Sequence, residues 1–321
     1  MIAIAIESSN SRGMGHLFRA ILYVNYLKKR NMDYIVLINQ DVPSLAILKQ
    51  HEITYEIVDY QDATSDWESQ IIKKYQVDIW FNDKFETNLM MGKHIKANSV
   101  LFCMIDDIGE AEVVCDLYFA GMIAPTKKEY HAKKVYAGSS FMVLNPQIEE
   151  YKRNRQTLNK VIVSMGGSDP YLVTFEVLKQ FLAYDYEVDF VIGPNYRERE
   201  QLLQLNNGRF KIMQNVPSLI QLFYDYDLAI TGGGVTCCEA NAAGLPALII
   251  ANAPHEVNTG RFMEQLGSAK YLGLHGEWDV SVLQSLREID LSSMSKIGRE
   301  KFNTNAVADI FEIIIQERKR L

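Results

Sequence analysis

A histidine follows two glycines near the start of the chain, in a setting that suits a general base. The run reads Ser8-Ser9-Asn10-Ser11-Arg12-Gly13-Met14-Gly15-His16, and it separates a short apolar segment from an amphipathic one. We therefore expect a strand, a tight turn and a helix that begins near His16. The positive end of a helix dipole favours the neutral imidazole, which is the form that accepts a proton. The alternative is a purely structural turn in which Gly13 and Gly15 relax the backbone and His16 caps the helix.

Two further glycine-rich turns follow apolar runs in the second half of the chain. Ser164-Met165-Gly166-Gly167-Ser168-Asp169-Pro170 suits a phosphate or a hydroxyl-rich ligand, and equally a helix capped by Asp169 with Pro170 at its first position. Thr231-Gly232-Gly233-Gly234-Val235-Thr236 offers flexible backbone and a helix start, a combination that cradles a diphosphate. One turn farther along, Glu239 would accept hydrogen bonds from ribose hydroxyls, or would be an ordinary carboxylate on a helix surface.

Other classes of enzyme and binding protein are disfavoured by motif and composition. There is no P-loop, and Phe18 stands where a dinucleotide-binding turn needs its third glycine. The four cysteines form no Cys-x-x-Cys pair and the six histidines are scattered, so we expect neither a metal nor another cofactor. A net charge of −7 gives no attraction for nucleic acid. No apolar run approaches a membrane span and the N-terminus lacks signal-peptide features, so a cytoplasmic protein without an integral membrane segment is expected.

Hydrophobic patterning predicts an α/β fold with two doubly wound, Rossmann-like domains that face a cleft. The 321 residues exceed the usual size of one core, and short apolar runs alternate with amphipathic ones in both halves. The expected strands are 2–6, 34–38, 54–58, 77–81, 100–105, 117–119, 161–164, 188–192, 210–213, 228–231 and 247–250. Helical patterns occupy 17–30, 44–50, 67–74, 86–96, 172–183, 197–205, 218–224, 236–243 and 258–266, and one or two helices cover 294–319.

The predicted domain boundaries follow from a change in composition. Residues 1–145 form the N-terminal domain that carries the glycine-histidine loop. Residues 146–159 are polar, charged and begin with a proline, so we interpret them as a linker. Residues 160–304 form the C-terminal nucleotide-binding domain and 305–321 a C-terminal helix. Ligands of such sheets bind at the carboxyl ends of the strands, where all three glycine-rich turns would lie.

Together, these motifs resemble the GT-B nucleotide-sugar enzymes. The pattern consists of Gly-x-Gly-His, Ser-x-Gly-Gly-Ser-Asp and Gly-Gly-x-x-Thr-x-x-Glu, in this order. It is most similar to the UDP-sugar hydrolase of pseudaminic acid biosynthesis and is related to the peptidoglycan N-acetylglucosaminyltransferase. The stretch Ile105-Asp106-Asp107 and the strand-end Asp83 look like acidic segments of the hydrolase family.

The resemblance implies specific roles for individual residues. His16 would activate the attacking group, and the nucleotide, UDP by this resemblance, would leave without help from a metal. The sugar would meet Gly13, Met14, Gly15, Asp83, Asp106, Ser168, Asp169, His255 and Asn258. The nucleotide would meet Gly166, Gly167, Asn215, Val216, Thr231, Gly232, Gly233, Gly234, Val235, Thr236 and Glu239.

Three departures from the hydrolase pattern leave the acceptor open. The family's Arg-x-Asp pair is replaced by Ala5 and Glu7, an interdomain arginine by Asn145, and a tyrosine by Phe85. The leading expectation is hydrolysis of a UDP-linked amino or deoxy sugar in surface-glycan biosynthesis, with water as acceptor. The alternatives are a glycosyltransferase that uses a saccharide or other hydroxyl acceptor, and an inactive protein that only binds the sugar nucleotide.

Overall fold

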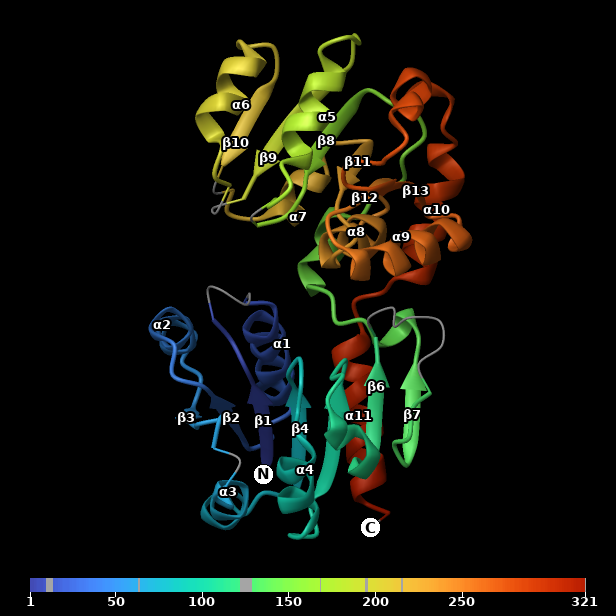
Figure 1. The fold of residues 1–321 in the computed structure, drawn as a ribbon. Coiled ribbons are helices and arrows are strands. Elements are labelled where there is room, and N and C mark those ends of the chain that lie inside the picture. The colour runs from blue at the N-terminus through green and yellow to red at the C-terminus, as the bar shows by residue number, and fades with distance from the viewer. Residues whose placement is uncertain are drawn as a thin grey trace. The chain divides into compact units, whose positions relative to one another are not determined.

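The protein consists of two compact units, each built on one parallel β-sheet. The computed structural model describes residues 1–9, 14–62, 64–121, 129–167, 169–193, 196–214 and 216–320, but not the side chain of His255. Unit 1 contains the described residues up to Val143 and those from Asn305 onward, and unit 2 contains Leu144–Thr304. The two sheets have seven and six strands, so the prediction of two Rossmann-like α/β units is confirmed (Figure 1).

Unit 1 has the strand order β3-β2-β1-β4-β5-β6-β7. Along β1, Ile2, Ile4 and Ile6 enter one core cluster while Ala3 and Ala5 enter another. Both faces of the sheet are therefore covered by helices, as apolar strands in a parallel sheet require. The elements are β1 (Ile2–Ile6), α1 (Gly15–Lys29), β2 (Tyr34–Ile38), α2 (Val42–Gln50), β3 (Tyr55–Ile57), α3 (Trp67–Tyr75), β4 (Ile79–Asp83), α4 (Leu89–Lys96), β5 (Leu101–Ile105), η1 (Glu110–Val114), β6 (Leu117–Ala120), β7 (Lys134–Ala137), η2 (Ser139–Phe141) and α11 (Ala306–Arg318).

Unit 2 repeats the pattern with the strand order β10-β9-β8-β11-β12-β13. The glycine-rich turns after β8 and β11 therefore lie at the same carboxyl edge, on neighbouring strands. Its elements are η3 (Pro146–Tyr151), β8 (Lys160–Ser164), α5 (Val173–Phe181), β9 (Glu187–Ile192), α6 (Arg199–Asn206), β10 (Lys211–Gln214), α7 (Leu219–Phe223), β11 (Leu228–Thr231), α8 (Val235–Ala242), β12 (Ala247–Ala251), α9 (Pro254–Leu266), β13 (Ala269–Leu274), η4 (Val280–Glu288) and α10 (Leu291–Lys301).

The C-terminal tail and the polar stretch 146–159 are each packed with one of the two compact units. The tail forms two helices, and the last of them, α11, packs Ile310, Phe311 and Ile314 into a core of unit 1. Residues 146–159, interpreted as a linker, belong to unit 2. Within them Arg155 has no exposed surface, and its guanidinium donates to the backbone carbonyls of Arg153, Phe223, Tyr226 and Ala243.

Candidate functional site

His16 is the second residue of α1 and is held by a buried aspartate. Among the residues that the structure describes, no side chain caps α1, whose N-cap residue is Met14. The Nδ1 atom of His16 lies 2.6 Å from Oδ1 of Asp83, the last residue of β4. The two meet because β1 and β4 are neighbours in the sheet, with Ile6 paired to Asp83.

Two further side chains of α1 converge on Asp83. The guanidinium of Arg19 bonds to Oδ1 of Asp83, and the hydroxyl of Tyr23 donates to Oδ2 at 2.7 Å. Arg19 also donates to Oδ2 of Asp106 at 3.0 Å. Arg19 and Tyr23 were missed by the sequence analysis, although their spacing from His16 places them on the same helix face. We call His16, Arg19, Tyr23, Asp83 and Asp106 the His16 network.

The electrostatics of the network favour one histidine tautomer. Burial opposes ionisation of Asp83, but the charges of Arg19 and His16 and the hydrogen bonds to it hold the pKa of this carboxyl below its usual value. The same carboxylates keep Arg19 protonated, raising its pKa despite burial. Nδ1 of His16 also lies 3.0 Å from Nη2 of Arg19, which can only donate. The ionised Asp83 is the partner that can accept a proton from Nδ1, and this contact favours the tautomer with its lone pair on Nε2. A His–Asp pair of this kind can act as a general base.

The other residues of unit 1 that were expected to meet the sugar differ in how exposed they are. The side chains of Asp83 and Asp106 are 0% and 5% exposed, so they lie behind His16 and do not present themselves to a sugar. Asp106 instead accepts from the amide of Gly121 at 2.9 Å as well as from Arg19. Met14 packs partly against the core, and Gly15 is exposed with open space around it. Gly13 lies outside the described residues.

In unit 2 the glycine loop after β11 is occupied in part by a carboxylate of the protein. Oε2 of Glu256, in the first turn of α9, accepts from the amides of Gly233 at 3.0 Å and Asn252 at 2.7 Å. A Cβ at Gly232 would come within 2.8 Å of the Asn252 side chain, and one at Gly233 within 2.5 Å of the Glu256 backbone. These two glycines are thus required by close packing. The Gly233 amide is not available to a phosphate, contrary to its expected role.

The amides beyond Gly233 remain suited to an anion. α8 begins at Val235, and its N-cap residue Gly234 provides no side-chain cap. Val235 is exposed and Thr236 partly buried, whereas Thr231 is buried in the strand. Backbone donors and the positive helix end therefore coincide at Gly234, Val235 and Thr236.

Glu239 is a partly buried acid on α8. Burial raises its pKa to about 7, and no charge among the described residues offsets this shift. A carboxylate in this state gains from any ligand that donates hydrogen bonds to it. This property fits the expected ribose contact better than the alternative of an ordinary surface carboxylate.

The turn after β8 is shaped by helix capping. Both carboxylate oxygens of Asp169 accept from α5, at 2.9 Å from the Val173 amide and 2.8 Å from the Thr174 amide. Asp169 is buried, so the capping alternative describes it and a sugar contact does not. α5 begins only at Val173, which leaves Pro170 in a turn before the helix. Gly166 has a φ of +91°, and its neighbour Gly167 is exposed.

Several expected residues lie outside what the structure describes. They are Ser168, Asn215 and the side chain of His255. Val216 is partly exposed just beyond β10, and Asn258 is partly exposed within α9, which begins four residues earlier than expected.

One group of side chains in the described part of the chain could bind a metal ion. Nδ1 of His94 lies 3.0 Å from Oε2 of Glu68 and 3.7 Å from Oδ1 of Asp66. Asp66 is also engaged, since it caps α3 through the Ser69 amide. Glu68 is buried and desolvation raises its pKa, and its hydrogen bond with His94 accounts for the contact without a metal.

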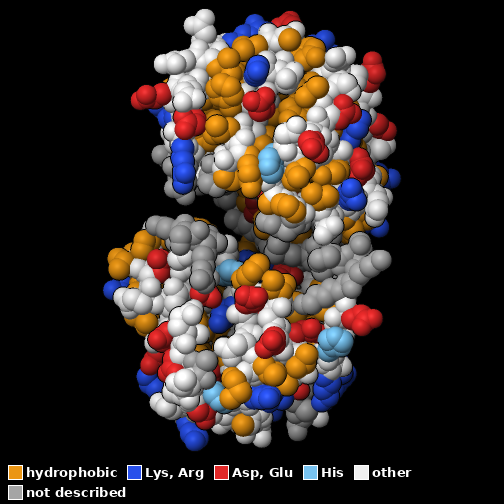
Figure 2. Space-filling view, viewed as in Figure 1, with side chains coloured by type: hydrophobic (Ala, Val, Ile, Leu, Met, Phe, Trp, Pro, Cys, Tyr) orange, Lys and Arg blue, Asp and Glu red, His pale blue; other side chains and the backbone are white. Residues whose placement is uncertain are grey.

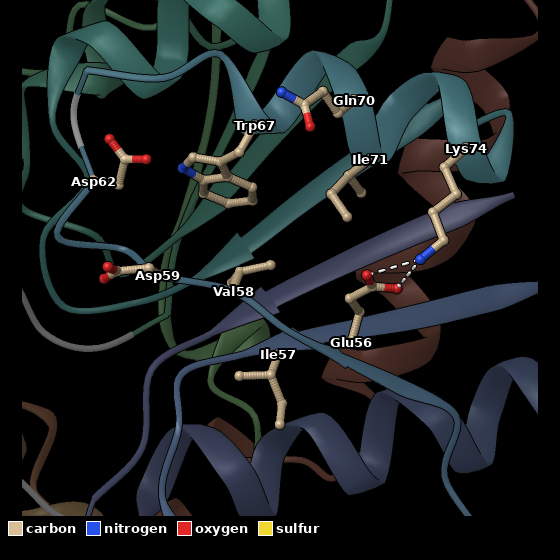
Figure 3. A pocket seen from close by; sticks show the side chains of 9 residues that line it. All are labelled: Glu56, Ile57, Val58, Asp59, Asp62, Trp67, Gln70, Ile71 and Lys74. Atoms are coloured by element: carbon tan, nitrogen blue, oxygen red, sulfur yellow. Dashed lines mark hydrogen bonds and ion pairs between the residues drawn. The ribbon is translucent and has the colours of Figure 1, made fainter.

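The surface of unit 1 has a pocket away from the His16 network. A pocket of about 370 Å³ lies between β3 and α3, where Trp67 and Ile71 face an ion pair of Lys74 with Glu56 (Figure 3). None of the residues expected to do chemistry lines it.

On the face shown in Figure 2, acidic and basic side chains are interspersed over the described residues of each unit. None of the helices that the described residues form is long and apolar enough to cross a membrane.

Comparison of the sequence with known proteins gives distant relatives. No protein-family profile matches the chain. An uncharacterized protein of Methanocaldococcus jannaschii is 24% identical over 78% of this chain and 55% of its own length. The spore coat polysaccharide biosynthesis protein SpsG of Bacillus subtilis is 24% identical over 85% of this chain and 84% of its own. The processive diacylglycerol beta-glucosyltransferase of Bacillus subtilis is 30% identical over 56% of this chain and 51% of its own. The chain thus spans about half the length of two of these relatives.

Comparison of the structure identifies the fold. MurG of Acinetobacter baumannii superposes with a TM-score of 0.70 at 14% identity, covering 98% of this chain and 99% of MurG. The UDP-GlcNAc 2-epimerase of Neisseria meningitidis, solved with UDP-GlcNAc, gives 0.63 at 13% identity over 98% and 100%. The Streptomyces glycosyltransferase SsfS6, solved with thymidine diphosphate, gives 0.59 at 12% over 98% and 100%. The chain has the GT-B fold, and the expected resemblance to GT-B nucleotide-sugar proteins is confirmed.

Proposed function

We propose that this GT-B protein is a glycosyltransferase that moves a sugar from a nucleotide-linked donor to a hydroxyl acceptor, with His16 as general base. The observation that carries the proposal is the contact of His16 Nδ1 with Asp83 at 2.6 Å, because an ionised aspartate at Nδ1 favours the tautomer in which Nε2 can accept a proton. The names of two relatives, a polysaccharide biosynthesis protein and a diacylglycerol glucosyltransferase, support transfer more than hydrolysis.

The proposed reaction is a single displacement. The acceptor hydroxyl gives its proton to Nε2 of His16 while its oxygen bonds to the anomeric carbon of the donor sugar. The bond between that carbon and the diphosphate oxygen breaks, and its electron pair leaves with the nucleoside diphosphate. Asp83 stabilises the imidazolium that forms, as an aspartate does in other His–Asp pairs.

The donor nucleotide is assigned to the carboxyl edge of unit 2. Its diphosphate would accept hydrogen bonds from the amides at Gly234, Val235 and Thr236, where the dipole of α8 offsets the leaving-group charge. Glu239 would bind the ribose hydroxyls and Val216 the edge of the base. We propose that no metal takes part, so turnover should be unchanged by EDTA.

The test is turnover of UDP-sugars and thymidine-diphosphate sugars with and without acceptors. Release of nucleoside diphosphate only when a saccharide or a diacylglycerol is supplied would support the transferase. Release without any acceptor would support the hydrolase expected from the sequence. Binding of UDP without turnover in any mixture would identify an inactive binding protein.

A matched pair of variants tests the base. His16→Ala should remove turnover and leave UDP binding intact, because His16 belongs to unit 1 and the proposed nucleotide site to unit 2. Lys28→Ala, on the same helix but with its amine on the carbonyls of His51 and Glu52, should keep full turnover. Full turnover by His16→Ala would exclude His16 from the reaction.

A further inference from the structure

Two aromatic side chains stack at the carboxyl edge of unit 2, outside the groups assigned above. The ring of Tyr171, in the turn after β8, lies 3.6 Å from the ring of His275, with an angle of 14° between their planes. Tyr171 is nevertheless 51% exposed, so only part of its surface is covered. His275 directly follows β13, and its amide bonds to the carbonyl of Ala251 at the end of β12. The pair therefore lies beside the residue that follows Ala251, which is Asn252.

Asn252 is a buried amide whose orientation is fixed. Its Nδ2 donates to the carbonyl of Met165 at 3.2 Å, and its backbone amide donates to Glu256. Its Oδ1 then points away from these partners and is buried without a hydrogen-bond partner among the described residues. Nδ1 of His275 is buried without a partner in the same sense. Unsatisfied buried polar atoms are costly, so two on adjacent strand ends call for an explanation.

We propose that Asn252, His275 and Tyr171 form the subsite that binds the sugar ring of the donor. This inference rests on the proposed function and assigns it a sugar-recognising surface. Asn252 Oδ1 would accept from one sugar hydroxyl, and His275 Nδ1 would bond to another. The exposed face of Tyr171 would pack against the C–H face of the pyranose.

The polar and charged groups around Asn252 favour a neutral sugar over a phosphate. Asn252 presents an acceptor oxygen, which repels phosphate oxygens that carry no proton. The Glu256 carboxylate lies next to it, bound to the Asn252 amide at 2.7 Å. Hydroxyl groups, by contrast, both donate and accept hydrogen bonds and so can satisfy both orphan atoms.

The order of the strands supports the same assignment. β10 and β13 are opposite edges of the sheet, with β11 and β12 between β8 and β13. The base is assigned beside β10, the diphosphate beyond β11, and this subsite beyond β12 and β13. A donor laid along the edge would thus present base, diphosphate and sugar in their covalent order.

The test compares UDP with UDP-N-acetylglucosamine and UDP-glucose by titration calorimetry. Tyr171→Ala and His275→Phe should each weaken binding of the preferred UDP-sugar roughly tenfold, the size expected for one aromatic contact or hydrogen bond. Both variants should bind UDP as the wild type does. Tyr171→Phe should keep the affinity, because it retains the ring. His275→Phe retains the stack and removes only the nitrogens.

The control is Tyr224→Ala, another tyrosine of unit 2 with 49% exposure, whose ring packs against Arg153. It should change neither affinity, and thermal unfolding should confirm that all variants are folded. Unchanged UDP-sugar affinity in Tyr171→Ala and His275→Phe, or equal losses for UDP and the UDP-sugar, would overturn the subsite alone. A wild-type protein that binds neither UDP nor any UDP-sugar would overturn the proposed function together with the subsite.

Discussion

In unit 1, the polar groups at the carboxyl edge of the sheet bind one another, whereas in unit 2 several of them have no partner among the residues that the structure describes. Asp83 alone accepts from His16, Arg19 and Tyr23. Of the His16 network, only Nε of Arg19 is buried without a hydrogen bond. At the edge of unit 2, Asn252 and His275 have orphan atoms, α8 lacks a side-chain cap and Glu239 is desolvated.

This difference between the two units matches the different physical requirements of a general base and of a ligand-binding surface. A base must have a fixed tautomer and position before its substrate arrives, and hydrogen bonds within the protein provide this. A binding surface must keep donors and acceptors available, at a cost in stability that the ligand later offsets. On this interpretation the folded chain contains a preassembled base in unit 1 and a nucleotide-sugar surface in unit 2 that is completed by its ligand.

Asp83→Asn should have the largest effect. It removes the charge that holds the Nδ1 proton, and loss of the aspartate from a comparable His–Asp pair lowers turnover by about 10⁴-fold. We expect a fall of at least about a thousandfold in kcat, with UDP affinity unchanged. The pH profile of kcat should shift as well, which a merely structural aspartate would not cause. Thermal unfolding must be measured in parallel, because Arg19 would be left beside a neutral partner. A variant that keeps wild-type kcat would show that the network is structural.

Glu239 should make nucleotide affinity depend on pH. With a pKa of about 7, the free protein holds a proton on Glu239 below neutrality, while ribose hydroxyls are bound best by the carboxylate. UDP affinity should therefore fall by up to about tenfold per pH unit below 7.

Stability should show the opposite trend for the same residue. Between about 4.5 and 7 the folded state keeps a proton that the unfolded state has lost, so ionisation of Glu239 destabilises the fold as the pH rises. Glu239→Gln should flatten both profiles. A UDP affinity that is independent of pH in the wild type would argue against the ribose contact.

The architecture could be predicted from the sequence, because strands that are covered on both faces of a sheet appear as short, continuous apolar runs. β13 was missed, since Lys270 and Gly273 interrupt its apolar pattern. The end of this strand carries His275, so the proposed sugar subsite was missed with it. The edge strand β7 was missed for a different reason: its residues are mostly exposed, so it has only a short apolar run.

The pairing of site residues could be predicted only in part. His16 and Asp83 were both singled out, but 67 positions separate them and only the pairing of β1 with β4 brings them together. Arg155 stands in a run of charged residues that resembles a solvated linker. Its partners are backbone carbonyls, including those of Phe223 and Ala243 at the ends of α7 and α8, which leave no trace in side-chain composition.

Glu256→Gln should have a smaller effect than Asp83→Asn or the protonation of Glu239. It should increase UDP affinity, whereas those two changes lower kcat or UDP affinity. The glutamine oxygen can still accept from the amides of Gly233 and Asn252, so the loop should keep its shape. Removing a negative charge next to the diphosphate should tighten UDP binding by roughly threefold to tenfold at low salt. Affinity for uridine, which has no phosphate, should not change and serves as the control. Weaker UDP binding would mean that the carboxylate organises the loop more than it repels the ligand.

Tyr23→Phe should have the smallest effect and shows whether the network acts as a unit. Phenylalanine keeps the edge-on packing against Phe81 and Phe311 and removes one hydroxyl, which donates to Oδ2 of Asp83 at 2.7 Å. A lost hydrogen bond to a buried carboxylate costs about 1.5–3 kcal/mol of unfolding free energy. Because His16 and Arg19 still hold Oδ1, kcat should fall only about twofold to fivefold, or roughly 0.4–1 kcal/mol of activation free energy, which is less than the loss of stability. If kcat instead falls as far as in Asp83→Asn, Oδ2 rather than Oδ1 controls the base, and the role given to the His16–Asp83 contact is wrong.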